Sequence, residues 1–280
     1  MTTDAPNLLI EVDGRPATEA DLQLRALDTY GHFTAMQIRD GRVRGLALHL
    51  DRLDSATREL FGVGLDGEHV RSLLRHALGD VRDASVRVYV HRQTETDERT
   101  RTAERTGTAE TTGTAGTTLM VTVRPPVATD GRAQSLMSVP YQRPVPHIKH
   151  LGGFAQIHYG RLAERAGFDS ALLTGRGGVV AEGAIANIAF WDGSSVVWSD
   201  APVLTGITMA LVHARLLSAG LPSVHREVTL ADLGRYRAAF VTNSHGVAPV
   251  SRIDETVFPG DATLLKTVTE LYDGVEWDRL

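Results

Sequence analysis

The fold of this chain is decided by the stretch from His147 to Asn187, which reads HIKHLGGFAQIHYGRLAERAGFDSALLTGRGGVVAEGAIAN. Apolar spacing predicts a helix over 154–166, and Gly167 ends it. Residues 170–174 and 179–181 are predicted to form a hairpin around the glycine-rich turn 175–178. One lysine, Lys149, precedes this unit, and one carboxylate, Glu182, follows its last strand 33 residues later.

Lys149 and Glu182 each allow two interpretations. A lysine acts as a nucleophile only when its amine is partly deprotonated, which requires burial or a nearby cation. Lys149 lies between His147-Ile148 and His150-Leu151, so it is a candidate Schiff-base lysine, but taken alone an exposed lysine at a strand end explains it as well. Glu182 is a candidate partner for a pyridinium nitrogen, whereas the alternative is a turn glutamate bonded to the amide of Gly183 or Ala184.

Three further segments could bind an anion. Gly206-Ile207-Thr208 opens a predicted helix, and amides at a helix N-terminus bind phosphate. Thr242-Asn243-Ser244 follows an apolar strand and could add donors. Arg52 borders the apolar face of a predicted helix over 48–61, where a half-buried guanidinium needs an anion. The alternatives are an ordinary N-cap, a polar turn and a rim arginine paired with a neighbouring carboxylate.

Composition limits the classes of function. The 280 residues are 42% hydrophobic and 22% charged, which is typical of a globular protein with a sizeable core. The net charge of -5 without a basic stripe argues against a nucleic-acid partner. The absence of cysteine excludes disulfides, thiolate metal sites and a cysteine nucleophile, and no metal site is predicted. Neither a signal peptide nor a membrane-spanning run is visible, so a soluble cytoplasmic protein is expected.

The other elements indicate two α+β domains, because strands dominate each half and helices are grouped. The smaller N-terminal domain is expected over 1–124, a linker over 125–134, and a larger C-terminal domain carrying Lys149 over 135–280. In the first domain, Asp40-Gly41 predicts a hairpin between strands 33–39 and 42–48. Residues 93–118 form an insert in which eleven of 26 residues are Thr, and we predict that it is disordered.

Taken together, the chain resembles the fold-type IV enzymes that depend on pyridoxal 5'-phosphate (PLP), the class IV aminotransferase family. This family includes branched-chain and D-amino acid aminotransferases and aminodeoxychorismate lyase. The matching pieces occur in the family's order: His49-x-x-Arg52-Leu53, Ile148-Lys149, Gly167-Phe168-Asp169-x-Ala171-Leu172, Glu182-Gly183-x-x-x-Asn187-Ile188, Leu204-x-Gly206-Ile207-Thr208, and Val241-Thr242-Asn243 leading to Pro249-Val250.

The resemblance implies a cofactor between the two domains and a homodimer. It implies that Lys149 is catalytic and carries the Schiff base, and that Glu182 holds the pyridine nitrogen. The remaining cofactor-binding residues that it implies are Arg52, Asn187, Gly206, Ile207, Thr208, Thr242, Asn243 and Ser244.

The substrate side departs from the family. Met36 and Gln37 stand where a substrate-contacting Arg or Tyr is common, and Met209 replaces an Arg of the aminotransferases. Gln37, His91 and Arg92 are the candidates for binding substrate. We expect an aminotransferase that acts on a small amine or amino acid together with a keto acid. The alternatives are a carbon–carbon lyase of the aminodeoxychorismate lyase type, which releases pyruvate, and a catalytically idle PLP-binding homologue.

Overall fold

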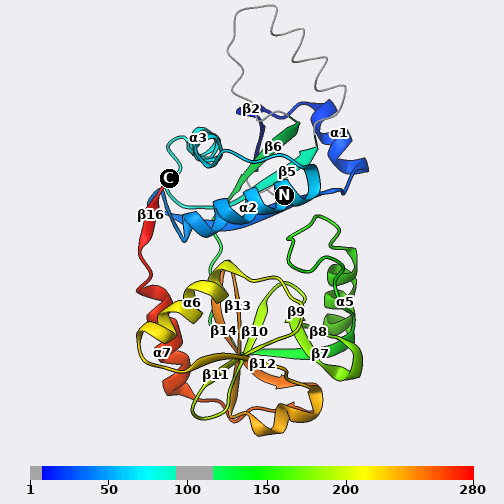
Figure 1. The fold of residues 1–280 in the computed structure, drawn as a ribbon, viewed down its shortest axis with the longest axis vertical. Coiled ribbons are helices and arrows are strands. Elements are labelled where there is room, and N and C mark those ends of the chain that lie inside the picture. Colours follow the sequence, from blue (N-terminus) through cyan, green and yellow to red (C-terminus); the bar gives the residue numbers. More distant parts are fainter. Residues whose placement is uncertain (1–7, 93–115) are drawn as a thin grey trace, which may run out of the picture. The chain divides into compact units, whose positions relative to one another are not determined.

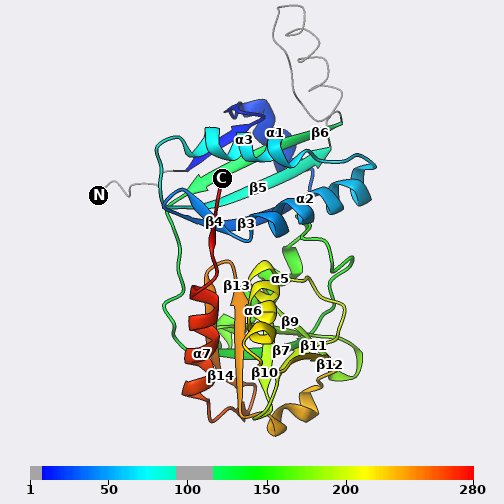
Figure 2. The same cartoon turned by 60° about the vertical axis from the view of Figure 1, so that its left-hand side comes forward.

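The computed structural model describes residues 8–92 and 116–280. Most of the Thr-rich insert, 93–115, lies outside the described residues, so the prediction of disorder there stays a prediction. The chain divides into two compact units, drawn as ribbons in Figures 1 and 2. None of the helices in the described ranges is both long and apolar enough to cross a membrane.

The first unit comprises Met1–Val127, Lys149–Gly152 and Trp277–Leu280. Its described part contains a seven-stranded sheet in the order β16-β4-β3-β5-β6-β1-β2. The strands are β1 (Leu9–Val12), β2 (Arg15–Pro16), β3 (Gly31–Arg39), β4 (Arg42–Arg44), β5 (Ala84–Arg92), β6 (Thr117–Arg124) and β16 (Trp277–Arg279). The helices are α1 (Glu19–Leu27), α2 (Leu46–Phe61) and α3 (Gly67–Leu78).

Alternation along β5 decides which face of this sheet is core. Val86, Val88 and Val90 are fully buried and pack in one apolar cluster with residues of α2 and α3, which cover that face in Figure 2. Arg87 and Tyr89 lie between these valines, so they belong to the opposite face. One face of the sheet is therefore filled by helices, and the other carries polar and aromatic side chains.

The hairpin between β3 and β4 forms as predicted at its turn, where Asp40 and Gly41 both have positive φ. The predicted partner strand over 42–48 is too long, because β4 ends at Arg44 and α2 begins at Leu46. Gly45 adopts the left-handed conformation, φ 69° and ψ 43°, and turns the chain out of the sheet. The side chain of Asp278 in β16 then accepts a hydrogen bond from the Leu46 amide at 2.8 Å and caps the helix.

The second unit comprises Ala128–Ile148 and Gly153–Glu276. Its described part contains a nine-stranded sheet in the order β12-β11-β10-β13-β14-β7-β8-β9, with β15 paired to β14. The strands are β7 (Gln134–Pro140), β8 (Ser170–Thr174), β9 (Val180–Gly183), β10 (Asn187–Trp191), β11 (Val196–Ser199), β12 (Ser223–Arg226), β13 (Ala238–Asn243), β14 (Gly246–Ile253) and β15 (Thr256–Val257). The helices are α5 (Phe154–Arg165), α6 (Ile207–Ser218) and α7 (Ala262–Asp273), with short 3-10 helices at Arg176–Gly178 and Leu230–Arg235.

The second sheet curls, because β9 at its end also contacts β10 and β11. Its strands enclose one apolar cluster that includes Phe190, and α6 and α7 cover a second cluster around Trp198 and Phe240. The Trp198 and Phe240 rings meet edge to face at 5.7 Å, and both side chains are fully buried. Burial of side chains of this size stabilises the fold by about 1.5–3 kcal/mol each.

Two short segments belong to the first compact unit although they lie beyond residue 127 in the sequence. Lys149–Gly152 belongs to the first unit because its backbone is hydrogen-bonded to β3. Trp277–Leu280 also belongs there because β16 pairs with β4. Both segments pair with strands that are far away in the sequence. Local sequence patterns do not predict such pairing.

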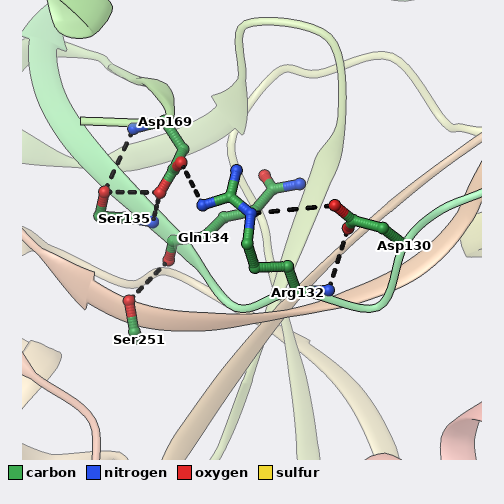
Figure 3. A network of polar contacts seen from close by, with 6 residues as sticks. All are labelled: Asp130, Arg132, Gln134, Ser135, Asp169 and Ser251. Carbon is green, nitrogen blue, oxygen red and sulfur yellow. Dashed lines mark hydrogen bonds and ion pairs between the residues drawn. The ribbon is translucent and has the colours of Figure 1, made fainter. Parts of the chain in front are cut away.

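A polar network connects the segment before β7 to the start of β8 (Figure 3). Asp169 accepts hydrogen bonds from the Ser135 amide and hydroxyl, both at 2.7 Å, and from Arg132 Nη1 at 2.7 Å. The bond from the Ser135 amide, with help from its hydroxyl and Arg132, lowers the pKa of Asp169 below its usual value. Asp169 is therefore the centre of this network.

We predict that Asp169→Ala lowers the free energy of unfolding by about 1.5–3 kcal/mol, the usual contribution of hydrogen bonds to a charged group. Asp130→Ala is the control, because Asp130 is an exposed partner of the same Arg132, and it should cost at most about 1 kcal/mol. Since the folded pKa of Asp169 is lowered, its contribution is fully present above the unfolded pKa of about 3.9 and is lost as pH falls through the folded pKa. Urea unfolding at neutral and acidic pH measures this, and equal losses in the two variants would contradict it.

Candidate functional site

Lys149 is fixed to the first unit by its backbone. Its carbonyl accepts a hydrogen bond from the Phe33 amide at 2.9 Å, and the Leu151 amide donates to the Gly31 carbonyl at 2.9 Å. His150 forms an antiparallel bridge with His32. The lysine is thus held beside the first half of β3, although it follows the second unit's Ile148 in sequence.

Two cations approach the same buried histidine in this unit. His49 in α2 contacts Thr34 Oγ1 through Nδ1 at 2.6 Å, which joins the helix to β3. Burial, together with the positive charges of Arg52 and Lys149, lowers the pKa of His49 to about 3. Arg52 is half-buried, and burial lowers its pKa to about 10, so it stays charged at neutral pH. The structure therefore brings together two sequence-predicted residues, Arg52 and Lys149, around a neutral histidine.

An aromatic pair lies beside the lysine. Lys149 Nζ is 4.9 Å from the centroid of the Phe33 ring, and Phe33 stacks on Tyr89 of β5 at 5.4 Å. Arg87 Cζ is 5.9 Å from the same Phe33 ring, and Arg87 Nη1 donates to the Tyr89 hydroxyl at 3.4 Å. Phe33, Arg87 and Tyr89 are not among the residues predicted from the sequence. Pairing the alternate residues of strands 33–39 and 86–90 would have placed them on one face.

The predicted substrate residues have different environments. The Gln37 amide is used within the fold, because it donates to Ser85 Oγ at 3.1 Å and accepts from the Val127 amide at 2.9 Å. His91 is almost fully buried, and burial lowers its pKa to about 3, so it is neutral. Arg92 is exposed, and by strand alternation it lies on the face opposite Tyr89. Their roles in substrate binding stay predictions.

In the second unit, Glu182 is a buried carboxylate with a buried cationic partner. It lies in β9, and its Oε1 is 3.1 Å from Arg143 Nη1. Arg143 Nη1 also donates to the Pro146 carbonyl at 3.0 Å, and Nη2 donates to the Ile148 carbonyl at 2.7 Å. Arg143 is not among the residues predicted from the sequence. A buried carboxylate requires a cation, and Arg143 stands shortly before Lys149 in a segment without regular structure.

Asn187 shapes the loop that opens α6. Its Nδ2 donates to the Leu204 carbonyl at 2.6 Å, and its Oδ1 accepts from the Gly206 amide at 3.0 Å. A Cβ on Gly206 would lie 2.1 Å from Asn187 Oδ1, so a side chain at this position would displace the Asn187 amide from its hydrogen bonds. Asn187 therefore supports the loop before Ile207, the first residue of the helix.

Thr208 and Thr242 have opposite hydrogen-bonding states. Thr208 Oγ1 donates to the Asn243 carbonyl at 2.7 Å, so its one proton joins α6 to the end of β13. Thr242 is 1% exposed, and within the described residues its Oγ1 has no hydrogen-bond partner. Asn187 and Thr242 are register partners in β10 and β13, which places both beside the start of α6. Asn243 Oδ1 accepts from the His245 amide and closes the turn that contains Ser244.

Lysine itself is rare in this chain. Lys149 and Lys266 are the only lysines in the sequence. Lys266 is exposed on α7, and its Nζ lies 3.8 Å from Glu270 Oε1 one helical turn away. Any chemistry that needs a half-buried lysine amine is therefore confined to Lys149.

Comparisons with known proteins agree with this geometry. The family model for amino-transferase class IV matches residues 31–253. No curated protein sequence matches the chain significantly. The fold is similar to that of a hypothetical aminotransferase from Mycobacterium tuberculosis in its PLP-bound form, at 20% identity and a TM-score of 0.77, covering 96% of this chain and 98% of that one.

Two further solved structures are similar. One is 4-amino-4-deoxychorismate lyase from Pseudomonas aeruginosa, with 24% identity, a TM-score of 0.76 and coverage of 95% of this chain and 99% of that one. The other is the branched-chain amino acid aminotransferase of Escherichia coli, with 15% identity, a TM-score of 0.78 and coverage of 95% and 94%. At these identities the likeness establishes the fold, which aminotransferases and a lyase share.

PLP is the cofactor of this family, and the residues present fit its phosphate. Phosphate needs several donors and no competing carboxylate. The N-terminus of the twelve-residue helix α6 and the unpartnered, buried Thr242 hydroxyl lie together in the second unit. A buried hydroxyl without an acceptor costs free energy unless a ligand satisfies it. The Thr208 hydroxyl is already used, so that residue's part in phosphate binding rests on its backbone amide.

We predict that Thr242→Val weakens PLP binding about tenfold, because a hydrogen bond to a charged group contributes about 1.5–3 kcal/mol. Without PLP, the variant should be as stable as the wild type or more so, since an unsatisfied hydroxyl is replaced by a methyl group. Thr174→Val is the matched control, because the Thr174 hydroxyl donates to the Val139 carbonyl within the same unit. That control should lose stability and keep its PLP affinity. Fluorescence titration measures PLP affinity, and thermal unfolding measures stability. A Thr242→Val protein that is less stable but binds PLP normally would contradict the prediction, because the hydroxyl would then stabilise the fold and not the bound cofactor.

Proposed function

Because this chain belongs to the class IV aminotransferase family, whose cofactor is PLP, we propose that it is an aminotransferase acting on a small amine or amino acid. The observation that carries the proposal is the position of Lys149. It is the one lysine besides the exposed Lys266, and it shares the environment of His49 with Arg52. A lysine amine acts as a nucleophile in its neutral form, and a positive charge in the same environment favours that form.

Lys149 Nζ would hold the cofactor covalently, and as a free amine it would move the proton at the substrate Cα. When bound, the cofactor supplies an electron sink in its pyridine ring. Glu182 would hold the proton on the ring nitrogen, a role supported by its burial beside Arg143. Arg52 contributes charge toward the phosphate, and Ile207 and Thr208 contribute amides at the start of α6.

The side chains near Lys149 support a substrate with an apolar part. Phe33 and Tyr89 form a stacked pair next to Lys149 Nζ, and such a surface contacts hydrocarbon or aromatic groups. Arg87 stands at the edge of this pair and is suited to a carboxylate. We therefore favour a hydrophobic amine or amino acid as the donor. Glutamate, with two carboxylates, would need a second cation on this face.

A carbon–carbon lyase acting on aminodeoxychorismate is the second candidate. The run Lys149-His150-Leu151 and the run Thr242-Asn243-Ser244 match that branch of the family at least as well. Lyases and aminotransferases use the same lysine and the same electron sink, so they differ in what surrounds the substrate carbon. A catalytically idle PLP-binding protein is the third candidate. Gln37 and Met209 stand where substrate-contacting residues are common in the family, and a protein without those residues could bind PLP without turning over a substrate.

The homodimer implied by the resemblance stays a prediction. Phe154 and Ile157 of α5 are large apolar side chains that are mostly exposed within the single chain. They are the residues of this helix that such an interface would cover.

We predict that a single-turnover titration with hydrophobic amines or amino acids converts the aldehyde spectrum of the bound cofactor to the amine spectrum, and that a keto acid reverses the change. The change requires an amine at position 149, so Lys149→Ala should abolish it, whereas Lys266→Ala, the matched control on α7, should leave it intact. Aminodeoxychorismate belongs in the same panel. Pyruvate release without a lasting spectral change would replace the aminotransferase with the lyase, and no change with any compound would favour the idle protein.

A further inference from the structure

The guanidinium of Arg143 connects two functional groups within the second unit. It contacts the Glu182 carboxylate at 3.1 Å and the Ile148 carbonyl at 2.7 Å, and Ile148 is the residue immediately before Lys149. Both charged side chains are nearly inaccessible to solvent, at 3% exposure for Arg143 and 9% for Glu182. We propose that Arg143 is a positioning residue that sets the proton on the cofactor's ring nitrogen through Glu182 and fixes the backbone that leads to Lys149. This proposal rests on the proposed roles of Glu182 and Lys149.

The first part follows from charge. Glu182 must remain a carboxylate if it is to hold a proton on the ring nitrogen, but burial penalises a lone carboxylate. Arg143 offsets this penalty, because the buried pair has no net charge. Glu182 and the ring nitrogen compete for one proton. When this proton is on the ring nitrogen, Glu182 is negatively charged and attracts the Arg143 guanidinium; when it is on Glu182, that attraction is lost. Arg143 therefore favours the protonated ring. A carboxylate has enough lone pairs to accept from both partners.

The second part follows from the loop that Arg143 encloses. Arg143 donates to the Pro146 and Ile148 carbonyls, and the Ile148 amide donates back to Val145 at 3.1 Å. Val145 has a φ of 44°, in the left-handed region. The other non-glycine residues with positive φ in the described ranges are Asp13, Asp40 and Asp254, and aspartate tolerates this conformation whereas a β-branched side chain does not. A strained loop persists only where its surroundings fix it, and here the Arg143 fork does so.

An arginine is required because one side chain must serve three acceptors in different directions. The planar guanidinium presents five donors in a fixed geometry, whereas a lysine offers a compact charge. Arg143→Lys therefore separates the two parts of the proposal. It keeps positive charge beside Glu182 and loses the fork that holds the loop.

The proton is tested with reconstituted full-length protein and PLP that carries an NMR isotope label on its ring nitrogen. In the wild type and in Arg143→Lys, the ring nitrogen should be protonated at neutral pH. In Arg143→Gln its apparent pKa should fall by at least about one unit, a tenfold change in the proton equilibrium. In a Glu182→Gln background, Arg143→Gln should have no further effect, because Arg143 acts through Glu182. Arg132→Lys, in the exposed pair with Asp169 of the same unit, is the matched control and should match the wild type.

The loop is tested by hydrogen exchange of the peptide that spans residues 143–149, in the same proteins with and without PLP. Arg143→Lys and Arg143→Gln should both exchange at least about tenfold faster than the wild type there, and Arg132→Lys should not. If Arg143→Gln does not fold, Arg143→Lys still decides the loop part, and Arg143→Met replaces Arg143→Gln as the uncharged variant that decides the proton part. Wild-type exchange in Arg143→Lys would overturn the loop part.

The outcomes separate this proposal from the proposed function. If Glu182→Gln deprotonates the ring nitrogen but Arg143→Gln does not, Glu182 keeps its role and the role of Arg143 is overturned. If neither substitution changes the ring nitrogen, the assignment of Glu182 itself fails. A structural defect alone would lower stability without shifting the ring-nitrogen signal, and that result would also overturn the proton part.

Discussion

Two backbone hydrogen bonds along one edge of β3 determine where Lys149 lies. β5 pairs along the whole of β3, whereas β4 on the other side pairs only with Ile38 and Arg39. The first half of β3 therefore has backbone groups that need partners, and the segment around Lys149 supplies them through Phe33 and Gly31. The short length of β4, set by the left-handed Gly45, thus creates the edge that receives the lysine.

The two units contain different charged groups. In the first unit, burial and the positive charges of Arg52 and Lys149 lower the pKa of His49, so this histidine is neutral. In the second unit, Arg143 offsets the cost of burying the Glu182 carboxylate, because the pair has no net charge. The second unit also contains the buried Thr242 hydroxyl beside the start of α6, which has no hydrogen-bond partner within the described residues. A phosphate bound there, as we propose, would satisfy this hydroxyl.

Sequence patterns predicted the parts of this fold that depend on local physics. The Asp40-Gly41 turn, the helix α2, and the helix α5 with the following hairpin of β8 and β9 follow from residue spacing and glycine placement. The patterns did not predict β14, because Pro249 lies within it, or the return of β16 to β4 from the far end of the chain. For the candidate site, motif order predicted Lys149, Arg52 and Glu182, and their roles stay predictions. It could not find Arg143 or the Phe33–Tyr89 pair, because a buried ion pair and a cross-strand stack depend on which strands become neighbours.

The most direct measurement is borohydride reduction of the PLP-loaded protein followed by peptide mass mapping. Only two lysines can be labelled, and Lys266 is an exposed helical residue paired with Glu270. A lysine held against β3 beside Arg52 and Phe33 is the expected site of the covalent bond. The pyridoxyl group should therefore map to Lys149 alone and persist in Lys266→Ala. A label on Lys266, or no label after loading with PLP, would contradict the role of Lys149.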